Sequence, residues 1–131
     1  MILVIDDDLR YTKEIIEKLP VEIETIIFLP GEMGELQAEC IKQLLDSEYG
    51  WAKGRVITTI EGIVAKVTEL NRSVILVDHS FGDDAITGKD VVTAIREALY
   101  KGKIIGNSSL SHLQNYCDGV GCGKIPPHVL A

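Results

Sequence analysis

Three aspartates that follow two apolar runs are the residues whose types and spacing could do chemistry. Asp6 and Asp7 come directly after the run 2–5 (ILVI), and Asp78 comes directly after the run 73–77 (SVILV). If both runs are neighbouring buried strands, the carboxylates converge and repel one another unless a cation neutralises them. A hard divalent ion with oxygen ligands meets this demand, and Mg²⁺ is the usual one beside phosphate.

A carboxylate in such a site could also react. With Mg²⁺ present, Asp78 could attack a phosphoryl group and form an aspartyl-phosphate. The transfer also needs positive charge and hydrogen-bond donors, because its barrier falls mainly through positioning and electrostatics. Ser108 and Lys124 follow later segments and could supply both. Each residue alone has a simpler interpretation: aspartate and serine often cap helices, and a lysine is usually a solvated surface charge.

The elements that must position these residues alternate between strand and helix. Apolar or β-branched runs predict strands over 2–5, 24–29, 55–60, 73–77 and 103–106. Apolar residues at helical spacing predict helices from Asp8 to Pro20, over 36–45, over 60–70, and from Gly88 to a C-terminal turn at Gly102. The segment 110–116 is a weaker helix, and the glycine-rich run 119–124 is a poor strand.

This alternation predicts an α/β, doubly wound sheet, because parallel neighbours need right-handed helical crossovers. In such sheets ligands bind beyond the carboxyl ends of the strands, where the strand order reverses. Asp6, Asp7 and Asp78 are all predicted to lie at such ends.

The composition limits which proteins the chain could be. Its 131 residues, 46% of them hydrophobic, suffice for one domain with one core. The net charge of -7 argues against a nucleic-acid partner, which needs a basic face. No run reaches the roughly 18 apolar residues of a membrane span, so we expect a cytoplasmic protein without a membrane contact. The cysteines Cys40, Cys117 and Cys122 are expected to be reduced thiols.

In their order, the segments ILVIDDD, VILVD, IIGNSS and GK resemble the response-regulator receiver family of two-component signalling. That family has an acidic pair after its first strand, an acceptor aspartate after the third, a Ser or Thr after the fourth and a lysine after the fifth. The stretch TGKDVVTAIREAL also resembles its glycine-led third helix. The resemblance covers 1–19 and about 73–124. It implies one receiver-like domain over 1–131, with a mainly parallel, five-stranded sheet of the flavodoxin-like or CheY-like kind.

The resemblance also implies a metal site. Asp6 and Asp7 would bind Mg²⁺, with Asp7 the more direct ligand, and Asp78 and the backbone carbonyl of Ser80 would complete the protein's share.

A phosphoryl site is implied beside that metal site. Asp78 would accept a phosphoryl group from a histidine kinase or phosphotransfer protein, while Ser108 and Lys124 would contact it. The chain would then signal to a downstream protein and lose the phosphoryl group by self-dephosphorylation, rather than act as a conventional enzyme.

Two departures from the family pattern lie between the acidic segments. The interval between Asp7 and Asp78 is longer than usual, which predicts an extra strand-helix unit within 20–72 and leaves open which unit is extra. The family's Met-Pro after the acceptor is replaced by the loop DHSFGDD. In that loop Asp83 and Asp84 could tune metal binding or remain solvated charges.

Two further departures lie near the C-terminal end. Gly121 replaces the aromatic residue that the family often places three before the lysine, so the usual hydroxyl-to-aromatic switch cannot operate in its usual form. After Lys124, the pair Pro126 and Pro127 prevents a helix, so the family's last helix is expected to be missing. We expect the helix over 36–45, or a second copy of the chain in a homodimer, to cover the sheet face left open.

Other interpretations stay open. The chain could be a receiver-like interaction module that is not phosphorylated. It could also resemble the haloacid-dehalogenase phosphohydrolases, with Asp6 as nucleophile and Asp8 as acid, although their last acidic motif should follow the lysine.

A zinc site is a third alternative, and four residues could form it: His112, Cys117, Cys122 and His128. Their spacing is wider than structural zinc favours, so core or surface side chains are the simpler interpretation.

Overall fold

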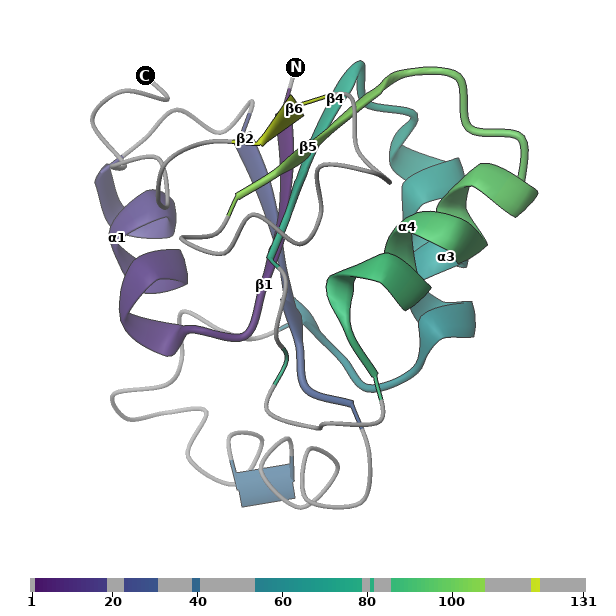
Figure 1. Cartoon of the computed structure of the whole chain (residues 1–131). Coiled ribbons are helices and arrows are strands. Elements are labelled where there is room, and N and C mark those ends of the chain that lie inside the picture. Colours follow the sequence, from purple (N-terminus) through teal and green to yellow (C-terminus); the bar gives the residue numbers. More distant parts are fainter. Residues whose placement is uncertain are drawn as a thin grey trace.

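The chain forms a parallel sheet between two layers of helices (Figure 1). The computed structural model describes residues 2–18, 23–30, 39–40, 54–78, 81, 86–107 and 119–120. The strands are β1 (Ile2–Asp6), β2 (Ile23–Phe28), β3 (Val56–Ile57), β4 (Val74–Val77), β5 (Lys103–Gly106) and β6 (Gly119–Val120). The helices are α1 (Leu9–Lys18), α3 (Ile60–Leu70) and α4 (Gly88–Glu97).

The strand order is β3-β2-β1-β4-β5-β6, and every neighbouring pair is parallel. The predicted α/β doubly wound fold is therefore confirmed. Without β3, which lies at the sheet edge, the order becomes the flavodoxin-like 2-1-3-4-5. Relative to that order β3 is the added strand, and the predicted insertion within 20–72 stays a prediction. The full order is also that of dinucleotide-binding sheets, so the strand order alone does not identify the chemistry.

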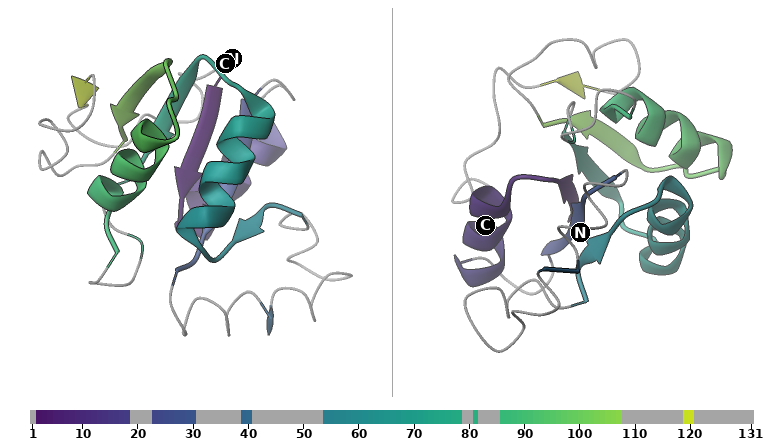
Figure 2. Two further views of the ribbon diagram at one scale, coloured as in Figure 1. Left: turned by 90° about the vertical axis from the view of Figure 1, so that its right-hand side faces the viewer. Right: turned by 90° about the horizontal axis from the view of Figure 1, so that it is seen from below.

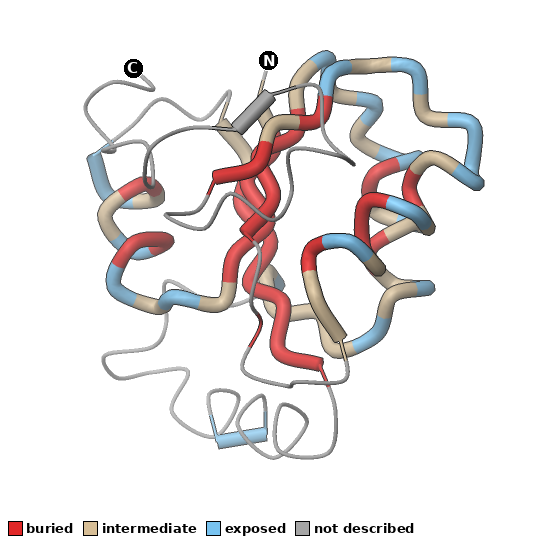
Figure 3. Tube along the Cα trace, viewed as in Figure 1, coloured by how far each residue is buried: buried red, intermediate tan, exposed pale blue. Residues whose placement is uncertain are grey.

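Each central strand has apolar side chains on both faces. Leu3, Ile5 and Val77 belong to the core on the side of α3 and α4. Val4 and Leu76 belong to a second core on the side of α1. In Figure 2 the view from below places α1 on one side of the sheet and the other two helices on the opposite side. Because both faces are covered, the strands are almost entirely buried, as the red central segments of Figure 3 show.

Helices α1 and α3 begin at side-chain caps. Oδ1 of Asp8 accepts hydrogen bonds from the backbone N–H groups of Arg10 (2.9 Å) and Tyr11 (3.1 Å). At the start of α3, the Thr59 hydroxyl oxygen accepts one from Gly62 N at 3.0 Å. These caps satisfy donors that have no partner within the helix. The cap at Thr59 also explains why β3 ends early and does not fill the predicted strand 55–60.

The end of α4 differs from the prediction. Leu99, and not Gly102, has the left-handed backbone conformation, with φ 66°. The N–H of Tyr100 bonds to the carbonyl of Ile95 (3.4 Å), and that of Leu99 bonds to the carbonyl of Arg96 (2.9 Å). This pair of bonds is a Schellman motif, in which glycine usually takes the left-handed position. The helix thus ends earlier than the glycine indicated.

β6 forms although its sequence is a poor strand. Gly119 and Val120 pair in parallel with Ile105 and Gly106 of β5. The pairing depends on backbone groups, which glycine supplies as well as any residue, so low side-chain propensity did not prevent it. The weaker helix over 110–116, most of the helix over 36–45 and the expected loss of the last helix lie outside the described residues.

Candidate metal centre

Three buried polar residues lie in one row across the carboxyl ends of neighbouring strands. The register pairs Ile5 with Val77, and one step further Asp78 N donates to the Ile5 carbonyl at 3.1 Å, which places Asp78 beside Asp6. In the same way Asn107 N donates to the Val77 carbonyl at 2.8 Å, which places Asn107 beside Asp78. The strand order reverses between β1 and β4, so the row crosses the point where doubly wound sheets bind ligands.

The row faces α1. Side chains alternate along a strand, and Val4 and Leu76, two positions before Asp6 and Asp78, both pack on the α1 side. Asp6 is 0% exposed and Asp78 is 6% exposed. These carboxylates are therefore held in the interior, close to the start of the helix.

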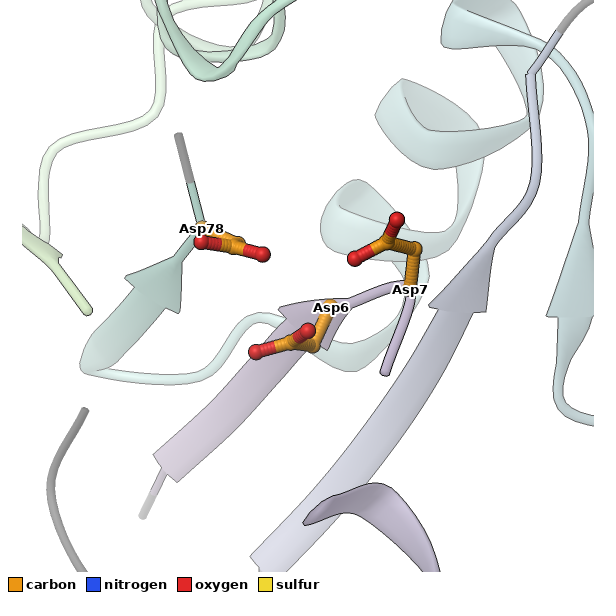
Figure 4. A group of neighbouring side chains, drawn as sticks. All are labelled: Asp6, Asp7 and Asp78. Atoms are coloured by element: carbon orange, nitrogen blue, oxygen red, sulfur yellow. The ribbon is translucent and has the colours of Figure 1, made fainter. Parts of the chain in front are cut away.

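Asp7 joins the two buried aspartates to form a cluster. One carboxylate oxygen each from Asp6, Asp7 and Asp78 lies within 4.8 Å of the others, and the three side chains point into a common space (Figure 4). Asp6 and Asp78 are buried, and Asp7 is half-buried. The structure thus brings together the three residues that the sequence predicted as metal ligands.

The donor set fits a hard divalent cation. Opposite oxygens around Mg²⁺ lie about 4.2 Å apart, because each Mg–O bond is about 2.1 Å long. A spread of up to 4.8 Å therefore requires the carboxylates to close slightly on Mg²⁺, or one of them to bind through water. Ca²⁺, with bonds of about 2.3–2.6 Å, would fit the same oxygens with less movement. A cation would also offset the cost of holding carboxylates together away from water.

A tight turn fixes the geometry of the acidic loop. Oδ1 of Asp6 accepts a hydrogen bond from Asp8 N at 2.9 Å. Asp8 itself is exposed, and its own Oδ1 caps α1. Two consecutive aspartates therefore serve the cluster, while the third starts the helix that follows it.

Asn107 is a site residue that sequence reasoning missed. It is 1% exposed, and its Nδ2 donates to the Tyr11 hydroxyl on α1 at 3.0 Å. In the sequence this asparagine directly precedes Ser108. Ser108 was predicted as the site residue because a hydroxyl was expected after this strand. The available signal was that a polar residue directly after a buried strand lies at the same edge as the aspartates.

The remaining predicted site residues lie outside the described residues. They are Ser80, Ser108 and Lys124, together with Asp83 and Asp84 of the loop after β4 and the four residues of the alternative zinc site. Their predicted roles stay predictions. Cys40, which is described, is an exposed free cysteine, as expected for a reduced thiol.

Comparisons with protein-family models, with curated proteins and with solved structures give no significant match. Within the described part of the chain, every helix is too short or too polar to cross a membrane.

Proposed function

We propose that this chain is a phosphoryl-accepting receiver domain of a two-component or phosphorelay system. One observation carries the proposal: the carboxylates of Asp6, Asp7 and Asp78 converge at the carboxyl ends of β1 and β4, where the strand order reverses. The fold is compatible with a receiver, and the cluster occupies the position where a receiver binds its metal ion and its phosphoryl group.

The chemistry requires a nucleophile, charge neutralisation and a donor of the phosphoryl group. An oxygen of Asp78 forms the new bond to phosphorus, while the bond from phosphorus to the donor, a phosphohistidine of a kinase or phosphotransfer protein, breaks. Mg²⁺ would supply the charge that offsets the phosphoryl oxygens. Asp6 and Asp7 would hold that ion and Asp78 would share it, so the nucleophile would also be a metal ligand. Ser108 and Lys124 remain the proposed contacts of the phosphoryl oxygens.

The phosphohydrolase alternative gains less support from the geometry. It needs Asp8 as an acid aimed at the reacting group, but the Asp8 side chain caps α1 through two backbone hydrogen bonds. Asp78, which that mechanism does not use as nucleophile, lies within the acidic cluster instead.

The contact-only alternative also gains less support. A module that acts only through its surface has no need of carboxylates gathered in the interior. Such a cluster lowers stability unless a cation occupies it.

The proposal is tested by incubating the protein with Mg²⁺ and acetyl phosphate and measuring the intact mass. We expect the gain of one phosphoryl group, labile in base, which is lost without Mg²⁺ and in Asp78→Asn. Asp8→Asn is the matched control, because asparagine caps a helix as well as aspartate does. That variant should still be phosphorylated if Asp78 is the acceptor. Phosphorylation that persists in Asp78→Asn but disappears in Asp6→Asn and Asp8→Asn would favour the phosphohydrolase.

A further inference from the structure

The row of polar residues at the carboxyl edge is linked to α1 by one buried side-chain hydrogen bond. Asn107, at the end of β5, donates through Nδ2 to the hydroxyl of Tyr11, on the first turn of α1, at 3.0 Å. These two residues are 96 positions apart in the sequence. We infer that this pair, called here the Tyr11–Asn107 clasp, positions the acidic cluster for its cation. The inference rests on the metal-binding part of the proposed function.

The clasp joins the helix that follows Asp7 to the sheet that carries Asp6 and Asp78. Asp6 is the last residue of β1, and Asp7 follows it in the turn that leads into α1, which is fixed to the helix through Asp8. Asp78 directly follows β4, which pairs with β1. If α1 shifted along the sheet, the turn with Asp7 would move relative to Asp6 and Asp78.

The hydrogen bonds form a nearly closed circuit around the cluster. Asp6 Oδ1 accepts a hydrogen bond from Asp8 N, and Asp8 Oδ1 accepts one from Tyr11 N. The Tyr11 hydroxyl accepts a hydrogen bond from Asn107 Nδ2, and the Asn107 N–H donates to the carbonyl of Val77, the residue before Asp78. Strand pairing between β4 and β1 then returns the circuit to the start. Of these links, the clasp is the side-chain contact that holds the start of α1 against β5.

Burial makes the clasp a rigid link. Asn107 is 1% exposed and Tyr11 is 9% exposed. The Tyr11 ring packs with Val4, Ile15 and Leu76, so its position is fixed by apolar contacts and its hydroxyl has little freedom. A hydrogen bond away from water keeps its geometry better than a solvated one. The clasp reaches the aspartates through the Asp8 cap and the Asn107 N–H, one step further out than the direct partners of metal ligands, whose loss weakens metal binding about 10- to 100-fold. Its loss should therefore weaken metal binding by the lower end of that range.

The test is a double-mutant cycle read out by Mg²⁺ affinity. The variants are Tyr11→Phe, Asn107→Ala and the double variant, each measured by calorimetric titration with Mg²⁺ alone. The phenylalanine keeps the buried ring and removes only the hydroxyl. We expect each single variant to bind Mg²⁺ about tenfold more weakly, and the double variant to be no weaker than the worse single one.

The matched control is Tyr100→Phe. It removes a similar tyrosine hydrogen bond, from the Tyr100 hydroxyl to the Arg72 carbonyl at 2.7 Å, far from the cluster. If the clasp had a purely structural role, Tyr11→Phe, Asn107→Ala and Tyr100→Phe would all lower the free energy of unfolding in urea. None of the three variants would then change the Mg²⁺ affinity. The expected result is a loss of affinity in Tyr11→Phe and none in Tyr100→Phe.

The outcomes separate the inference from the proposed function. If the natural chain binds Mg²⁺ and Tyr11→Phe binds it equally well, the inference fails and the metal site stands. If the natural chain binds no Mg²⁺, the metal site itself fails. Should Asn107→Ala not fold, the comparison of Tyr11→Phe with Tyr100→Phe still decides the question.

Discussion

The two ends of the sheet carry different kinds of side chain. At the carboxyl ends of β1, β4 and β5, buried polar side chains gather: Asp6, Asp78 and Asn107. At the opposite end, where α3 and α4 finish, a pocket of about 240 Å³ has Val67 and Ile95 in its lining. Beside it Leu99 is 79% exposed. One end gathers buried polar side chains, and the other has a pocket of mixed lining beside an exposed leucine.

The hydrogen bonds at the opposite end serve the backbone. The Tyr100 hydroxyl donates to the carbonyl of Arg72. The guanidinium of Arg96 donates to the carbonyls of Tyr100 (3.1 Å) and Gly102 (2.9 Å). The Arg96 bonds satisfy carbonyls where α4 turns into β5, and the Tyr100 bond satisfies one between α3 and β4. Carbonyls beyond a helix end need such partners.

At the carboxyl end, Asp8 caps α1, and Asp6 accepts one backbone hydrogen bond, from Asp8 N. Asp6, Asp7 and Asp78 also bring three negative charges together, which a helix cap does not require. The same fold thus uses side chains to satisfy backbone carbonyls at one end and holds like charges together at the other. The proposed binding of a cation would be a physical reason to keep these charges together.

The largest expected effect is a stabilisation by Mg²⁺ that depends on the acidic cluster. At a concentration of about 100 times the dissociation constant, the ion should raise the unfolding free energy by about 2.7 kcal/mol. In Asp78→Asn most of this gain should vanish, because one ligand is lost. Urea unfolding with and without Mg²⁺ measures it, and Glu97→Gln, an exposed change on α4, is the control. An equal gain in both variants would remove the distinction between the two ends.

A smaller effect is expected at the opposite end from Gly102→Ala. A Cβ atom there would lie 2.7 Å from the Ser73 carbonyl oxygen and would overlap the Tyr100 ring. The ring cannot easily move, because its hydroxyl bonds to Arg72. The unfolding free energy should fall by about 1–3 kcal/mol, with the Mg²⁺ gain unchanged.

The control for this change is Lys101→Ala, an exposed neighbour, which should alter stability by less than about 0.5 kcal/mol. If Gly102→Ala also reduced the stabilisation by Mg²⁺, the two ends of the sheet would be energetically coupled. That result would contradict the contrast drawn between them.

The smallest effect is expected from Leu99→Gly, and it is a gain. The left-handed backbone of Leu99 costs about 1–2 kcal/mol for a residue with a side chain, while glycine loses about 0.5–1 kcal/mol in entropy. The net gain should be about 0.5 kcal/mol in thermal or urea unfolding. Ala98→Gly, at a neighbouring residue with φ -81°, should instead lose stability. Equal losses in both variants would mean that the turn at Leu99 is not strained.

Much of the fold could be predicted from local patterns. The runs 2–5 and 73–77 are apolar without alternation, which is typical of strands covered on both faces, and they became β1 and β4. Helix α3 was predicted over its full length, because its apolar residues recur at helical spacing. The predictions were wrong at element ends, where a local cap or a strained turn competes with propensity, as at Thr59 and Leu99.

The sequence by itself determined which residues could be metal ligands, because Asp6, Asp7 and Asp78 each follow a run that must be buried. Only the tertiary structure decided that these runs are neighbours in register, which brings the carboxylates together. It also decided the pairing of Tyr11 with Asn107, which no local pattern signals. The physical reason is that a residue type and its strand are local properties. The distance between two side chains depends on how distant segments pack.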